Sequence, residues 1–297
     1  MGKCAKSREV ISLNNLFNSI MEKLKIIIPT DFSVQADFAY VMVKKMEHKI
    51  PMQIHFVHVM SVPDTITLRP DGSFDTCGEV DVHFLEQQKT IADRKLAELI
   101  ATYGDGIYTH LLAGKITDAI LDFSLAQHAD LIVMGTKGAW GIKEKLSGTE
   151  AQAIATRSTI PVLSLMCDRS DLDINNILLV HDFTAQSNLD ITLLHQLLLA
   201  FNSTLHLLQF VSEEDSNNKD AINTKMNEWA AVHQIPRFHI HLINDVNLEQ
   251  AVIHFNERMP IDMVAIGIHE QHGIFKKQPA EALINHLYKP IISLRLH

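Results

Sequence analysis

The sequence predicts an α/β protein of two tandem doubly wound domains, each a five-stranded, mostly parallel sheet with helices on both faces. Its 297 residues exceed a typical single domain. Short apolar runs alternate with helical patterns, as in parallel sheets. The order of these segments also occurs twice, at a period too long for a solenoid. We therefore expect an N-terminal extension at 1–20, a first domain at 21–168 and a second at 174–297.

The first half alternates between expected strands and expected helices. Buried apolar runs predict the strands: Lys25–Ile28, Ile54–Val59, Leu131–Met134 and Pro161–Leu165. Apolar residues at helical spacing, or good helix formers, predict the helices: Val34–Lys45, Val82–Tyr103, Ile116–Phe123 and Ala151–Ala155. Strands joined through helices run parallel with right-handed crossovers, so their carboxyl ends should meet at one edge of the sheet.

The second half repeats these segments in the same order. Four pairs of segments match: Ile27–Ser33 with Leu178–Thr184, Ile54–Val59 with Leu205–Phe210, Ala129–Gly135 with Ile261–Gly267, and Pro161–Leu165 with Pro290–Leu294. The chain is therefore interpreted as a duplicated domain.

Composition excludes several classes of protein. The formal net charge of −9 disfavours a nucleic-acid or anionic-membrane surface. No apolar run reaches the roughly 18 residues of a membrane span. Three scattered cysteines predict reduced thiols and a cytoplasmic location. Residues 1–20 lack the apolar core of a secretory signal, so they are expected to be a loose extension, or translation begins at Met21.

A glycine-rich loop is the strongest chemical motif. Gly135-Thr136-Lys137-Gly138 follows the expected strand Leu131–Met134, and Gly148-Thr149 precedes the expected helix Ala151–Ala155. Backbone N–H groups free of side-chain bulk, beside a helix N-terminus, suit a phosphate. The spacing matches neither the P-loop nor the dinucleotide-binding fingerprint. Read one at a time, these glycines are ordinary turn residues.

The spacing Gly-x2-Gly-x9-Gly-Ser/Thr resembles the ATP-binding motif of the universal stress protein family. Three further stretches resemble this family in order: Pro29–Ser33, Val57–Val59 and Ile160–Leu163. The resemblance is clear over residues 24–166 and weaker over 175–296. In the family, domains pair through their last strands. Pairing of Val162–Met166 with Ile291–Arg295 would then give an intramolecular pseudo-dimer, and further homodimerisation stays open.

The resemblance implies a set of nucleotide-binding residues. Pro29 and Met134 would lie around the adenosine, Asp31 would meet its ribose, and the Val59 backbone would meet adenine. The phosphates would meet Gly135, Gly138, Gly148 and Thr149. For Asp31 the alternative is a cap on the helix starting near Ser33. Glu150 could weaken phosphate binding or help hold Mg²⁺, and both readings stay open.

The resemblance implies a stress-response ATP-binding regulatory protein, with the nucleotide in the first half and an unknown protein partner. The second half lacks the glycine spacing, so its site is expected to be degenerate. Two alternatives remain: a slow Mg²⁺-dependent ATPase, and a scaffold that binds no nucleotide. No catalytic residue is predicted, because no nucleophile or kinase signature occurs. The seventeen histidines lack zinc-site spacings, so no metal-binding residue is predicted.

Overall fold

The fold is given by a computed structural model, which describes residues 23–77, 80–136, 150–168, 173–183, 189–211, 218–268 and 287–295. Its strands are β1 (Leu24–Pro29), β2 (Met52–Ser61), β3 (Ile66–Leu68), β4 (Phe74–Thr76), β5 (Ile107–Gly114), β6 (Leu131–Gly135), β7 (Val162–Leu165), β8 (Asn176–Val180), β9 (Thr204–Phe210), β10 (Phe238–Ile243), β11 (Met263–Ile268) and β12 (Ile291–Arg295). Its helices are α2 (Val34–Glu47), α3 (Val82–Tyr103), α4 (Ile116–Ala126), α5 (Glu150–Arg157), α6 (Thr192–Phe201), α7 (Lys219–Val232) and α8 (Leu248–Arg258).

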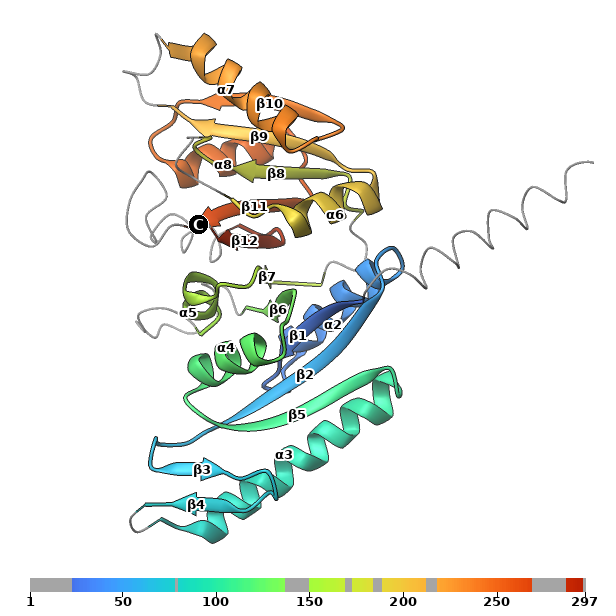
Figure 1. The fold of residues 1–297 in the computed structure, drawn as a ribbon, viewed down its shortest axis with the longest axis vertical. Coiled ribbons are helices and arrows are strands. Elements are labelled where there is room, and N and C mark those ends of the chain that lie inside the picture. The colour runs from blue at the N-terminus through green and yellow to red at the C-terminus, as the bar shows by residue number, and fades with distance from the viewer. Residues whose placement is uncertain are drawn as a thin grey trace, which may run out of the picture.

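One 10-stranded sheet runs through both halves of the molecule, in the order β10-β9-β8-β11-β12-β7-β6-β1-β2-β5 (Figure 1). Within each half the neighbouring strands are parallel, and the two halves repeat the same strand order outward from the centre. The central strands β7 and β12 are antiparallel, with Ser164 opposite Ile291 and Val162 opposite Ser293. The expected pairing of the last strands is therefore confirmed.

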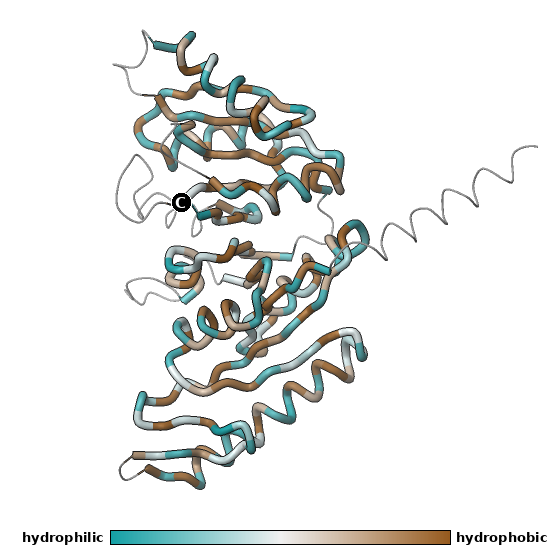
Figure 2. The backbone as a smooth tube through the Cα atoms, in the orientation of Figure 1, coloured by the Kyte–Doolittle hydropathy of each residue, from teal (hydrophilic) through white to brown (hydrophobic). Residues whose placement is uncertain are grey.

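Helices cover both faces of the sheet. One apolar core lies under α2, α6 and α7, with the end of α3 packed against it. The opposite core lies under α4, α5 and α8. Figure 2 shows the central strands as largely hydrophobic, which is expected of strands buried on both sides. The doubly wound α/β fold predicted from the alternating pattern is confirmed.

Helix α3 begins and ends where its sequence signals predict. The Asp81 carboxylate accepts a hydrogen bond from the Phe84 N–H at 3.0 Å and caps the first turn. Gly104 follows the last turn at φ 88°, a conformation that favours glycine. Leu85, Ala92 and Leu96 are its buried face. Among the described helices, none has the combined length and apolarity needed to cross a membrane.

A two-stranded hairpin, β3–β4, was not among the expected elements. Its strands are antiparallel, with Ile66 opposite Thr76. The turn contains Gly72 at φ 84°, and the Asp71 carboxylate accepts a hydrogen bond from the Ser73 N–H at 2.9 Å. Three-residue strands carry too short an alternation to be recognised, although Pro70-Asp71-Gly72 is a strong turn signal.

The first half holds a pair of histidines, His55 buried and His110 half-buried, between its outer strands and helix α4. The Nδ1 atom of His55 lies 2.9 Å from the Nε2 atom of His110, within hydrogen-bonding distance. The ring of Phe123, from α4, lies 4.7 Å from the His110 ring. Burial, followed by the charges of His110 and Lys25, lowers the pKa of His55 to about 4.

The second half repeats this arrangement. The Nδ1 atom of His206 lies 3.1 Å from the Nε2 atom of His241, and Phe255 from α8 lies 4.7 Å from the His241 ring. The His206 Nε2–H donates to the Asn176 Oδ1 at 3.2 Å, so its Nδ1 accepts from His241. Burial, followed by the charges of His241 and His239, lowers the pKa of His206 to about 4.

Candidate functional site

A cavity of about 350 Å³ opens at the carboxyl ends of β1, β2 and β6, beside the first turns of α4 and α5. Ligands of doubly wound sheets bind at this edge. The cavity brings together five of the residues predicted from the sequence: Pro29, Asp31, Val59, Met134 and Gly135. The other three, Gly138, Gly148 and Thr149, lie outside the described residues.

The turn between β1 and α2 carries Asp31 to the rim of the cavity. The Thr30 hydroxyl accepts a hydrogen bond from the Phe32 N–H at 2.9 Å, and an Asp31 carboxylate oxygen accepts from the Ser33 N–H at 3.0 Å. Ser33 is the N-cap of α2, and its side chain makes no capping hydrogen bond. Asp31 therefore stabilises the turn before the helix, rather than capping it, while its carboxylate borders the cavity.

The inner wall of the cavity is apolar. Val59 at 8% exposed and Met134 at 6% come from the sheet. Ile120 from α4 and Ile154 from α5 complete this wall and are also buried. A wall of this kind suits a flat apolar group, and the polar atoms at the rim determine which one.

Gly135 has a packing role that the sequence did not reveal. A Cβ atom at this position would lie 2.0 Å from the Gln35 carbonyl oxygen and 2.4 Å from its carbon. The first turn of α2 therefore packs directly on the backbone at the end of β6. The sequence assigned Gly135 to a phosphate cradle; this contact requires glycine whether or not a phosphate binds.

The polar rim is acidic. Burial, followed by the negative charge of Asp31, raises the pKa of Glu150. Among the described residues that line the cavity, none is lysine or arginine. Hydrogen-bond donors or a cation on a ligand would complement these two carboxylates. Glu150, which the sequence left as either a group that weakens phosphate binding or a ligand of Mg²⁺, lines the cavity.

Thr136 is a candidate ligand contact that sequence reasoning missed. It lines the cavity, is 3% exposed, and its hydroxyl finds no hydrogen-bond partner among the described residues. Its N–H donates to the Leu165 carbonyl at 2.6 Å, which ties its backbone to β7. A buried hydroxyl without a partner is costly. The sequence feature that could have identified Thr136 is its position directly after Gly135, the first glycine of the loop.

Replacing Thr136 by valine should separate folding from ligand binding. The change removes the hydroxyl at nearly constant volume, so the free energy of unfolding should stay the same or rise slightly. The affinity of whatever ligand contacts the hydroxyl should fall about two- to tenfold. Urea unfolding and calorimetric titration check the two effects. Ser164→Ala removes another buried hydroxyl without a described partner, outside the cavity lining, and should leave affinity unchanged.

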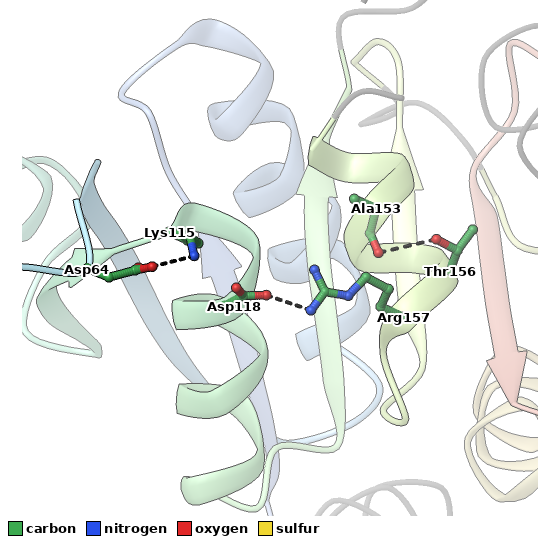
Figure 3. Close-up of polar contacts among 6 residues, drawn as sticks. All are labelled: Asp64, Lys115, Asp118, Ala153, Thr156 and Arg157. Atoms are coloured by element: carbon green, nitrogen blue, oxygen red, sulfur yellow. Dashed lines mark hydrogen bonds and ion pairs between the residues drawn. The ribbon is translucent and has the colours of Figure 1, made fainter. Parts of the chain in front are cut away.

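Ion pairs connect helix α4, one wall of the cavity, to its neighbours. Arg157 on α5 lies 2.5 Å from Asp118 on α4, and Lys115 before α4 lies 2.6 Å from Asp64 (Figure 3). These pairs are exposed, so water and salt screen them and they contribute little to stability. The position of α4 therefore depends mainly on the apolar core beneath it.

Comparison with known proteins agrees with this architecture. The model of the universal stress protein family matches residues 24–165. A universal stress protein of Methanocaldococcus jannaschii is 29% identical over 139 residues, 47% of this chain and 79% of that protein. Another, from Thermus aquaticus, is 38% identical over 53 residues, 18% of this chain and 39% of that protein.

Structural similarity extends over both halves. The crystal structure of a universal stress protein from Archaeoglobus fulgidus superposes with a TM-score of 0.70. The match covers 92% of this chain and 96% of the Archaeoglobus chain. At 18% identity this likeness concerns the fold. The family match concerns the half that contains the cavity. Residues 24–165, the half that contains the cavity, therefore belong to the universal stress protein family.

Proposed function

We propose that this chain is a regulatory protein of the stress response that binds one adenine nucleotide, ATP, in its first half. The observation that carries the proposal is the cavity at the carboxyl edge of the sheet, which collects residues from β1, β2 and β6. The apolar wall of Val59 and Met134 suits the adenine ring. The carboxylate of Asp31 can accept hydrogen bonds from the ribose hydroxyls. The phosphates would extend toward the glycine loop.

The acidic rim favours a nucleotide that carries a divalent cation. Asp31 and Glu150 offer carboxylate oxygens, the ligand type that Mg²⁺ prefers, so the residues present fit this ion. The ion would offset the repulsion between the two carboxylates and the phosphates. Nucleotide affinity should therefore be higher with Mg²⁺ than without it.

Replacing Asp31 by alanine tests the proposed site. The change removes a charged acceptor, so the affinity for Mg-ATP should fall about tenfold or more. Calorimetric titration of the full chain measures both affinity and stoichiometry, which should be one per chain. Asp182, which matches Asp31 in the repeat, provides the matched control: Asp182→Ala should bind as the wild type does. Unchanged affinity in the Asp31 variant would remove this site from the proposal.

Slow hydrolysis of ATP is a second candidate, favoured by one observation. Burial and Asp31 together raise the pKa of Glu150, which makes this carboxylate a stronger proton acceptor for an attacking water. Hydrolysis would appear as ADP that accumulates over hours with wild-type protein and is lost in Glu150→Gln. Bound ATP recovered intact would leave the regulatory role. No nucleotide binding in any form would favour a protein-interaction scaffold.

A regulatory role requires a partner that distinguishes the nucleotide-bound from the free state. A ligand shifts such an equilibrium only by its different affinity for the two states. Thr136 and Glu150 line the cavity and flank the glycine loop in the sequence, so a partner that contacts this surface would detect a bound nucleotide. Partner capture with and without Mg-ATP, compared with the Asp31 variant, identifies such a protein.

A further inference from the structure

A second cavity, about 440 Å³ in volume, lies on the other side of the strand ends, between them and helix α3. We call it the α3 groove. It borders the first cavity at Asp31, His58 and Val59, which line both. Its apolar lining includes Phe84, which is 54% exposed, and Ile91, which is 42% exposed. Both lie on the α3 side of the groove, where water can enter.

The floor of the groove holds an aromatic ring with a cation above it. Phe32 adopts a left-handed backbone conformation at φ 62°, uncommon for a bulky residue. Its ring packs against His58 with centroids 4.4 Å apart, and the Lys95 ammonium lies 5.0 Å above the ring. A lysine over a ring face is attracted by the electrons of the ring, which holds the charge at the groove.

The Lys95 side chain lines the groove and places its ammonium over the Phe32 ring. Among the residues that the structure describes, it forms no ion pair. The neighbouring cation on α3, Arg94, pairs instead with Glu98 at 3.8 Å. Asp31 also borders the groove, and one of its oxygens accepts a hydrogen bond from the Ser33 N–H. Among the described residues that line the groove, Lys95 is the one lysine or arginine, so it is the side chain that an anionic ligand would meet.

In the second half, the position that corresponds to the α3 groove is filled by a side chain of the protein. Phe183 matches Phe32 in the repeat, has the same left-handed conformation at φ 50°, and is only 4% exposed. The indole of Trp229 on α7 lies 5.3 Å from it, edge to face. An aromatic side chain of the protein therefore covers Phe183, whereas over Phe32 there is a charged side chain and open space.

We propose that the α3 groove is a binding site for a small ligand with an aromatic or alkyl body and one negative charge, a carboxylate or sulfonate. The body covers Phe32, Phe84 and Ile91, and the anion meets the Lys95 ammonium. The ligand takes the place that Trp229 fills in the second half. The groove shares Asp31, His58 and Val59 with the proposed nucleotide cavity, but the test below measures binding of a different probe and does not depend on nucleotide binding.

The fluorescent anion 8-anilinonaphthalene-1-sulfonate has this chemistry and serves as the probe. Fluorescence titration of the full-length wild type should give one saturable site with a dissociation constant on the order of 10 μM. Lys95→Trp imitates the second half by placing an indole over Phe32. It should weaken probe binding about tenfold or more, with an unchanged unfolding midpoint.

Charge variants provide a second test that does not depend on how the indole packs. Lys95→Gln should weaken probe binding about two- to fivefold, the effect of one partly exposed ion pair. Arg94→Gln removes the neighbouring charge from the same helix without touching the groove, and should leave binding unchanged. If Lys95→Trp binds the probe as the wild type does, the probe sits elsewhere and the proposal is overturned. Absence of saturable binding to the wild type overturns it as well.

Discussion

Replacing Gly135 by alanine should destabilise the first half more than alanine at any other glycine that the structure describes in this half. The new Cβ atom would lie 2.0 Å from the Gln35 carbonyl oxygen, a backbone atom that no side-chain rotation can move. Either β6 or the first turn of α2 must shift. We expect a loss of about 3–5 kcal/mol in the free energy of unfolding, in the range of severe overpacking. Urea unfolding followed by circular dichroism measures this loss.

Gly106 provides the matched control for this prediction. It lies in the turn between α3 and β5, and an added Cβ atom there meets nothing within 4 Å. Gly106→Ala should therefore change the free energy of unfolding by less than about 1 kcal/mol. Because the cavity shares the Gly135 backbone, Gly135→Ala should also lose ligand binding. A Gly135→Ala protein with wild-type stability would show that α2 does not press on this strand end.

Acidification should destabilise the fold steeply between about pH 6.5 and pH 4. Burial, followed by neighbouring histidines, lowers the pKa of His206 to about 4, and burial does the same for His181 against the opposing charge of Asp182. Above pH 6.5 these rings are neutral in both the folded and the unfolded chain. Below pH 6.5 these histidines are protonated in the unfolded chain but stay neutral in the folded chain. Protonation therefore favours the unfolded chain, and the free energy of unfolding falls.

The expected loss is about 3 kcal/mol for His206 alone by pH 4, and His55 adds a loss in the same direction. His181 allows a direct test of this pH dependence. Its Nδ1 atom accepts a hydrogen bond from the Phe183 N–H at 2.9 Å. At the matching place in the first half, the Thr30 hydroxyl accepts the same hydrogen bond from the Phe32 N–H. His181→Thr keeps an acceptor at this position without a titrating group.

Urea unfolding at a series of pH values should therefore give a shallower pH dependence for His181→Thr than for the wild type, whatever its stability at pH 7. The control, His48→Thr, changes an exposed histidine and should keep the wild-type slope. Equal slopes in all three proteins would mean that protonation of His181 does not oppose folding.

Local sequence patterns predicted most of the fold because each strand and helix carries its own periodicity. The expected helix Val82–Tyr103 matches α3, and the expected helix Val34–Lys45 matches most of α2. The resemblance to the universal stress protein family predicted the central pairing of β7 with β12, because domains of that family pair through their last strands. The hairpin β3–β4 was missed because its strands are too short to show alternation.

The candidate site was predicted only in part, for a different reason. Pro29, Asp31, Val59, Met134 and Gly135 belong to recognisable motifs, and they do line one cavity. Thr136 matters through the absence of a hydrogen-bond partner, and Glu150 through its proximity to Asp31 across the cavity. Neither property belongs to a single stretch of sequence, so both needed the packed structure.

The sequence by itself predicted the alternation of strands and helices, the repeated order of segments in the two halves, and the edge of the sheet at which the cavity opens. These follow from hydrophobic periodicity and from the handedness of strand–helix–strand units, which act over a few tens of residues. Only the tertiary structure decided the packing role of Gly135, the orphan hydroxyl of Thr136 and the difference between Lys95 and Trp229 over equivalent phenylalanines. The physical reason is that each depends on distances between atoms from separate elements, which local patterns leave open.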